Sequence, residues 1–401
     1  MKLIRLSLNI GLFYALYLFI SCSEAPIETD LSSINSGTDT LLITEISGFN
    51  YQISPDIGNY DKLYLGSKDD VSFLSSLFNF SLSSWNTFSD SAVFIDSIFF
   101  KVFSGDSLLE NNPLINLHFS EDSIFDESIS LVSELNDVSF DNWVDLGMPF
   151  VDAMIDTSDS VASFQQTVLK WDLGMILETI IDTSILYRTL SLSLPSESSS
   201  FFELYSREYN SGSLDPKIEV YYRKEIGTNP DSSTMDTLTR IIYVAEDISI
   251  IEALEIDNYD DDILISRARG SRAILNVPFD SLDLPQYSVI HSAKLHLFQP
   301  NDSLVNFKVI MNPLKFLPDS ISTIYNADPY ENLGIHSSSA STVSNKLEIS
   351  LKAYLQSISV TDSIKNVGFK LNSSSENDLF ESVNFDLNHN SNRLEIFYVS
   401  P

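Results

Sequence analysis

The chain has 401 residues, of which 43% are apolar and 11% aromatic, enough for buried cores in about two to three domains. Its 56 acidic residues outnumber 23 Lys and Arg, and the net charge of −33 argues against a nucleic-acid partner, whose phosphates need basic residues. The single cysteine excludes intrachain disulfides and cysteine-rich zinc sites.

The first 21 residues have the pattern of an export signal. Lys2 and Arg5 precede a mostly apolar run, and the small Ser21 is followed by the only cysteine, Cys22. This arrangement resembles a bacterial lipoprotein signal, in which the cysteine is acylated after cleavage. The alternatives are an ordinary cleaved signal or a transmembrane anchor. We expect residues 1–21 to be removed, Cys22 to carry the lipid, and the protein to lie in the cell envelope, at the outer membrane and facing the periplasm or the cell surface.

Residues 22–40 are predicted to form a flexible tether. The segment is acidic and rich in Ser and Thr, and it has little apolar patterning from which a core could be built. Such a tether would hold the folded part of the chain away from the membrane.

From residue 41 onward, the dominant pattern is an alternation of apolar and polar residues, which is typical of strands with one buried face. It is clear in 217–221, 293–297, 346–350 and 393–397. Many short strands between Ser, Asn, Asp and Pro turns predict an all-β fold of antiparallel sheets.

An internal repeat organises this part of the chain. Five features recur in the same order, and one of them is a helical pattern of apolar residues. Each feature of the first copy is followed here by its counterpart in the second: 77–80 by 274–277, 95–103 by 290–298, 106–108 by 302–304, the helical pattern from Leu173 by that from Leu351, and 217–222 by 393–398.

The repeat predicts two tandem antiparallel β-sandwich domains, jelly-roll-like, each with one short helix. We place domain one at 41–223, a polar linker at 224–239 and domain two at 240–399. The offset between copies falls from 195 (290 − 95) to 178 (351 − 173). Domain one therefore carries an acidic insertion of about 17–19 residues between 103 and 173, which a surface loop can absorb.

A set of fold-forming motifs marks domain two. Arg272 opens an apolar strand, Phe279-Asp280 begins a turn that ends at Leu-Pro, a later strand starts Ala-x-Leu at Ala293, and the last strand is 393–398. These motifs resemble the bacterial DNRLRE-type β-sandwich family, and through the repeat the likeness extends faintly to domain one. Members are commonly appended to secreted polysaccharide-degrading enzymes and some bind glycans, so the resemblance implies a β-sandwich and a link to glycans.

Motifs for catalysis are missing from the sequence. It has no G-x-S-x-G, P-loop, G-x-G-x-x-G or H-E-x-x-H pattern, and its five histidines are scattered. With 56 carboxylates, acidic pairs at glycosidase spacing arise by chance. We expect a protein that is not an enzyme and needs no cofactor, calcium aside.

An acidic cluster at 257–262 is the candidate calcium site. Asp257, Asp260 and Asp262 offer the hard oxygen ligands that Ca²⁺ prefers. The cluster lacks the EF-hand pattern, and the alternative is a solvated turn before a strand at 263–265.

Three arginines form the candidate ligand site. Arg267 and Arg269 are expected to project from one face of a strand, with Arg272 close by. They could grip carboxylates or sulfates of an acidic polysaccharide while Tyr259 stacks on a sugar. The alternative is that they pair with the neighbouring aspartates and fix a turn.

Two functions fit these features. The first is a lipid-anchored, non-catalytic binding protein of the cell envelope, with a glycan or an envelope polysaccharide as ligand. The second is a structural or assembly component of an envelope complex, with another envelope protein as partner. In both, the N-terminal lipid holds the chain to the membrane.

Overall fold

The computed structural model describes residues 38–55, 58, 60–105, 114–121, 125–127, 140, 142–155, 165–195, 198–209, 212–226, 234–252, 262–279, 284–285, 287–300, 306–316, 328–360 and 367–400. The predicted signal, most of the tether and the predicted site residues Cys22, Asp257, Tyr259 and Asp260 lie outside these ranges.

The described residues form several antiparallel sheets, which confirms the all-β prediction. We call the sheets built from residues 62–251 the N-terminal unit. One sheet has the order β11-β3-β4-β10-β6-β7, and β14 also pairs with β4. The other has the order β13-β12-β5-β9-β8. The bounds are β3 Lys62–Lys68, β4 Val71–Asn79, β5 Val93–Ser104, β6 Asn116–Ser120, β7 Val144–Gly147, β8 Phe150–Ile155, β9 Gln165–Asp172, β10 Thr189–Ser193, β11 Phe201–Tyr205, β12 Lys217–Ile226, β13 Thr234–Tyr243 and β14 Glu246–Ile251.

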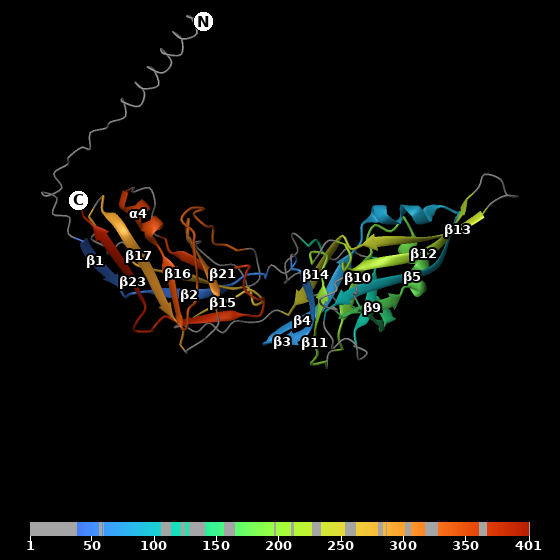
Figure 1. The fold of residues 1–401 in the computed structure, drawn as a ribbon, viewed down its shortest axis with the longest axis horizontal. Coiled ribbons are helices and arrows are strands. Elements are labelled where there is room, and N and C mark those ends of the chain that lie inside the picture. Colours follow the sequence, from blue (N-terminus) through green and yellow to red (C-terminus); the bar gives the residue numbers. More distant parts are fainter. Residues whose placement is uncertain are drawn as a thin grey trace, which may run out of the picture.

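The C-terminal unit contains the sheets built from residues 38–52 and 262–399, and it lies end to end with the N-terminal unit (Figure 1). One sheet has the order β19-β18-β21-β16-β15-β22, and β2 also pairs with β16. The other has the order β1-β23-β17-β20. The bounds are β1 Thr38–Ile43, β2 Ser47–Gln52, β15 Asp262–Ser266, β16 Ser271–Asn276, β17 Val289–Phe298, β18 Lys308–Pro313, β19 Ser338–Ser341, β20 Lys346–Ser350, β21 Phe369–Ser373, β22 Ser382–Asp386 and β23 Arg393–Val399.

Short helices occur where the two helical patterns predict them. The 3-10 helix η4 (Gly174–Ile176) runs into α3 (Leu177–Ile181), and α4 (Lys352–Val360) follows β20. A further 3-10 helix, η2 (Leu82–Ser89), was not expected from the sequence and buries Trp85 and Phe88. In the part of the chain that the structure describes, no helix has the length and hydropathy to cross a bilayer.

The strand order is the same in both units, as the internal repeat predicts. Strand for strand, β11-β3-β4-β10-β6-β7 corresponds to β22-β15-β16-β21-β18-β19, and β12-β5-β9 corresponds to β23-β17-β20. Strand β8 has no counterpart and lies within the predicted acidic insertion. The insertion thus adds an edge strand to the sheet and is more than the surface loop we expected.

The path of the chain differs from the predicted domain boundaries. The predicted linker, 224–239, belongs largely to the hairpin of β12 and β13, in which Lys217 pairs with Tyr243. Its polar residues misled the prediction because β13 is an edge strand that is exposed at most positions. Strand β1 pairs with β23 and β2 pairs with β16, so the C-terminal unit takes its first two strands from the start of the chain.

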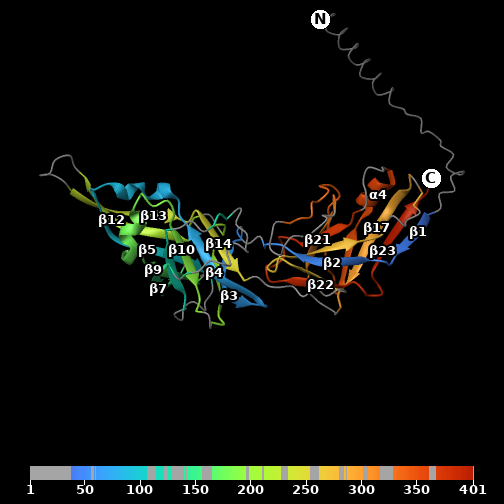
Figure 2. The same ribbon diagram turned by 180° about the vertical axis from the view of Figure 1, so that it is seen from behind.

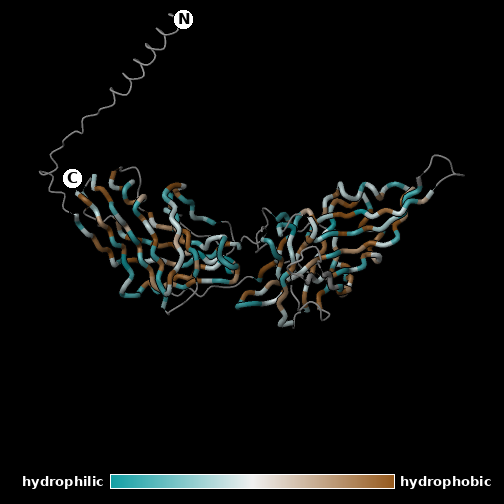
Figure 3. The backbone as a smooth tube through the Cα atoms, viewed as in Figure 1, coloured by the Kyte–Doolittle hydropathy of each residue, from teal (hydrophilic) through white to brown (hydrophobic). Residues whose placement is uncertain are grey.

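Each unit has its own core, to which both of its sheets contribute, and a further core lies at their junction. Brown and teal alternate along the strands of both units in Figure 3, as the sequence alternation requires. The junction core combines Tyr64 and Phe73 with Ala268, Leu379 and the partly buried Phe380. The junction core thus draws on both units. Figure 2 shows, from behind, that β3 and β4 lie on the side of the N-terminal unit that faces the C-terminal unit.

Candidate functional site

The turn between β15 and β16 holds two of the predicted ligand-site arginines. Residues 267–270 form this turn, so Arg267 and Arg269 do not share a strand face as expected. Gly270 has a φ of +62°, and a Cβ there would lie 2.0 Å from the carbonyl oxygen of Ile53. Only glycine therefore lets the end of β2 pass this closely, and the Ile53 amide donates to the Gly270 carbonyl at 3.0 Å.

The Arg267 side chain crosses toward the segment after β21. Its Nη1 donates to the carbonyl oxygens of Ser375 (3.0 Å) and Asn377 (3.1 Å). Its guanidinium lies 4.7 Å from the centre of the Tyr60 ring, a cation–π distance. Among the described residues, no carboxylate forms an ion pair with Arg267.

Arg269 points away from Arg267, toward the N-terminal unit. Its Nη2 lies 3.8 Å from a carboxylate oxygen of Asp70, whose side chain is 96% exposed. An ion pair this exposed contributes little to stability. Arg269 therefore belongs to the contact between the units.

A cavity of about 180 Å³ lies beside Arg267. It is lined by residues 53–55, Tyr60, Ser266, Arg267, residues 270–272, Asn372, Ser373 and Ser375. This volume suits one ring-sized group, such as a single sugar unit of a longer chain. Hydroxyl, amide and guanidinium groups in one small cavity suit a polar, anionic ligand.

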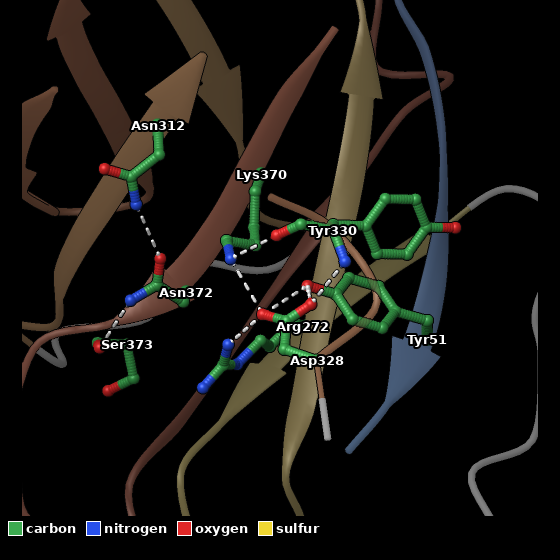
Figure 4. A network of polar contacts seen from close by, with 8 residues as sticks. All are labelled: Tyr51, Arg272, Asn312, Asp328, Tyr330, Lys370, Asn372 and Ser373. Atoms are coloured by element: carbon green, nitrogen blue, oxygen red, sulfur yellow. Dashed lines mark hydrogen bonds and ion pairs between the residues drawn. The ribbon is translucent and has the colours of Figure 1, made fainter. Parts of the chain in front are cut away.

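The third arginine, Arg272, belongs to a network around Asp328 (Figure 4). The Asp328 carboxylate forms ion pairs with Arg272 and with Lys370, the latter at 2.7 Å. It also accepts hydrogen bonds from the Tyr51 hydroxyl (3.2 Å) and the Tyr330 amide (3.0 Å). The network links β2, β16 and β21 to the segment at 328–330.

Charge is concentrated and largely hidden in this network. Lys370 is 7% and Asp328 17% exposed. Burial opposes ionisation of Asp328, but the Lys370 ammonium, the Tyr330 amide and Arg272 outweigh it and lower the pKa of its carboxyl. Burial, followed by the charge of Asp328, raises the pKa of Tyr51, which stays a neutral donor. Two cations share one carboxylate, so the wall of the cavity carries a net positive charge.

The calcium prediction can be compared with the structure only at Asp262. Its Oδ2 accepts a hydrogen bond from Asn384 at 3.1 Å, at the start of β15. The described residues contain no group of three His, Cys, Asp or Glu arranged to hold a metal ion. Since Asp257 and Asp260 lie outside them, calcium binding stays a prediction.

Sequence reasoning missed the partners of Arg272 in the Asp328 network. Tyr51 and Asp328 are separated by 277 positions, and Arg272 and Asp328 by 56. No local pattern links residues so far apart. The one local signal was Lys370, a lysine between the apolar residues Phe369 and Leu371 of β21.

No known protein family, curated protein or solved structure matches this chain. The resemblance to the DNRLRE-type family therefore stays a prediction that rests on the motifs of domain two.

Proposed function

We propose that the chain is a lipid-anchored, non-catalytic binding protein of the cell envelope, and that its ligand is an acidic glycan or envelope polysaccharide. The observation that carries the proposal is Arg267, which lines a polar cavity without a carboxylate partner among the described residues. Tyr60 and the Ser and Asn side chains beside it supply the stacking and hydrogen-bonding groups that sugars need.

We further infer that each unit is a jelly-roll-like β-sandwich. Support comes from the cores, since each draws on both sheets of its unit: Phe78 and Phe100 in one, Leu275 and Leu295 in the other. The N-terminal lipid on Cys22 belongs to the same proposal.

The test is a titration of the full chain with a galacturonic acid trimer and with the uncharged galactose trimer. The charged sugar should bind and the neutral one should bind far more weakly. Arg267→Ala should weaken binding about tenfold or more, since a charge-assisted hydrogen bond contributes roughly 1.5–3 kcal/mol. Binding should also fall as salt rises.

Arg269→Ala is the matched control. It removes the same charge two positions away, but Arg269 does not line the cavity. Equal loss in both variants would point to nonspecific attraction, and no binding to either sugar would reject the glycan proposal.

A second candidate is a structural or assembly component of an envelope complex. The edge strand β13 favours it, because an exposed edge offers unpaired backbone groups to another protein. It also exposes Met235 (46%), Ile241 (43%) and Tyr243 (43%). Placing charge on this edge with Ile241→Lys should abolish co-purification of an envelope partner and leave sugar binding unchanged; unchanged co-purification would reject this candidate.

A further inference from the structure

Strands β1 and β2 occupy in the C-terminal unit the place that β13 and β14 occupy in the N-terminal unit. Ile43 pairs with Leu394 as Ile242 pairs with Ile218, and positions 218 and 394 are equivalent in the repeat. Ser47 pairs with Asn276 and Glu246 pairs with Asn79, again at equivalent positions.

The two strand pairs are therefore interchangeable in register. Both comparisons give one offset, 242 − 43 = 199 and 246 − 47 = 199. Each unit is thus completed by a strand pair of the same kind. The N-terminal unit is completed by β13 and β14, which follow it directly in the chain. The C-terminal unit is completed by β1 and β2, which precede the N-terminal unit in the chain.

Specific contacts hold the pair β1–β2 in the C-terminal unit. The Asn50 side chain donates to the carbonyl of Asp262 (3.1 Å) and accepts from the amide of Leu264 (2.9 Å). Gln52 Nε2 donates to the carbonyl of Arg269 at 2.8 Å. Ile43 is buried in the core of the C-terminal unit. The contacts are those of an integral part of the fold.

Only one covalent connection joins the two interlocked parts of the chain. Residues 38–252 include β1, β2 and the whole N-terminal unit, and residues 262–400 include the rest of the C-terminal unit. The nine residues 253–261 connect them (261 − 252 = 9). Every other link between the parts is noncovalent: the strand pairings, the Asp328 network and the junction core.

We propose that the partner of this chain is a second copy of itself, in a reciprocally exchanged dimer. Residues 38–252 of each copy complete the C-terminal unit of the other. All contacts among the described residues of the single chain are kept, and the nine residues 253–261, which can span up to ~30 Å, connect the two copies. Exchange of identical elements is a low-cost route to dimers, and it is favoured at high local concentration. This inference is independent of the proposed glycan site.

The test uses two full-length variants that each hold one cysteine, in a Cys22→Ser background. One carries Leu42→Cys on β1 and the other Glu395→Cys on β23, positions that face each other across the two strands. The two chains are unfolded together, refolded at high concentration and oxidised with oxidised glutathione. We expect a disulfide-linked species of about twice the 45.0 kDa chain mass that contains both variants.

Two controls make the result decisive. The Leu42→Cys chain refolded with a Met175→Cys chain measures random collision, because Met175 is 69% exposed in the N-terminal unit, away from β1. A Leu42→Cys/Glu395→Cys double variant should close its disulfide within one chain at low concentration. Crosslinking no greater than in the Met175 control overturns the exchange, and a double variant that does not close overturns the β1–β23 pairing on which it rests.

Discussion

At the scale of single residues, one carboxylate contacts two cations and side chains of three strands. Asp328 contacts Tyr51 on β2, Arg272 on β16 and Lys370 on β21. The sequence singled out Arg272 for its neighbouring arginines, but nothing local could reveal its partner. Long-range contacts in a β-fold are set by sheet topology, which a single sequence does not encode in any short pattern.

Asp328→Asn should lower the free energy of unfolding by about 2–4 kcal/mol, because it leaves the buried ammonium of Lys370 without a counter-charge. The measurement is urea unfolding near neutral pH. Glu331→Gln is the control, since Glu331 and Lys315 form an ion pair in which both side chains are 58% exposed; this change should cost no more than about 0.5 kcal/mol. A similar small cost for both variants would contradict the role of Asp328.

A second carboxylate, that of Asp247, is expected to make the stability of the fold depend on pH. Asp247 is 1% exposed. Burial first, then the charges of Glu208 and Glu127, raises the pKa of Asp247 to about 8. Because the folded pKa exceeds the unfolded value near 3.9, the neutral form favours the fold. The contribution of Asp247 to stability is therefore fully present below about pH 4 and is lost as the pH rises toward 8.

The check is the urea midpoint between about pH 5 and pH 8.5. It should fall over this range in the wild type, and Asp247→Asn should flatten the decline, because the amide cannot ionise. Asp70→Asn, at a 96% exposed side chain, should keep the wild-type slope. A wild-type midpoint that rises with pH would show that Asp247 is ionised in the fold.

At the scale of elements, the turn at Gly270 decides how closely β2 can approach β16. Gly270→Ala should destabilise the fold by about 2–4 kcal/mol, since its Cβ would collide with the Ile53 carbonyl and its φ is positive. Gly212→Ala is the matched control, with a φ of +103° and no atom within 4 Å of the added Cβ. It should cost only the backbone term, about 1–2 kcal/mol, in the same urea experiment. Equal costs would mean that β2 yields without resistance.

Elements were predictable where one face is buried and the other exposed. The alternation in 217–221, 293–297, 346–350 and 393–397 identifies β12, β17, β20 and β23. The alternation did not identify β13, because an edge strand that is exposed on both faces lacks alternating apolar residues, and its polar sequence resembles a linker. It failed again at Arg267 and Arg269, where two-residue spacing falls in a turn.

At the scale of the whole molecule, the repeat predicted two similar units but not how the chain is shared between them. Strands β1 and β13 occupy equivalent register positions, so the offset between the copies does not show which unit each strand joins. That choice depends on the connections 53–61 and 253–261. Neither connection carries a sequence pattern that indicates which unit a strand joins.

The proposed membrane attachment is also tested at the scale of the whole molecule. Cys22→Ala should move the protein from the membrane fraction to the soluble fraction or leave it unprocessed, because the only cysteine follows the apolar leader. The measurement is fractionation with detection by immunoblot. Identical fractionation and migration of wild type and variant would reject the lipid anchor, and Ser23→Ala should behave as wild type.

The pairing of β1 with β23 also determines the order in which the two units can fold during synthesis. Thr38 pairs with Val399, so the first strand of the chain must wait for a partner made 361 residues later (399 − 38). At ~5–20 residues per second, synthesis takes roughly 20–70 s to cover that distance. During this interval the N-terminal unit can assemble completely, since β13 and β14 follow it directly. Strand β23 then completes its sheet of the C-terminal unit by pairing with β1 and β17.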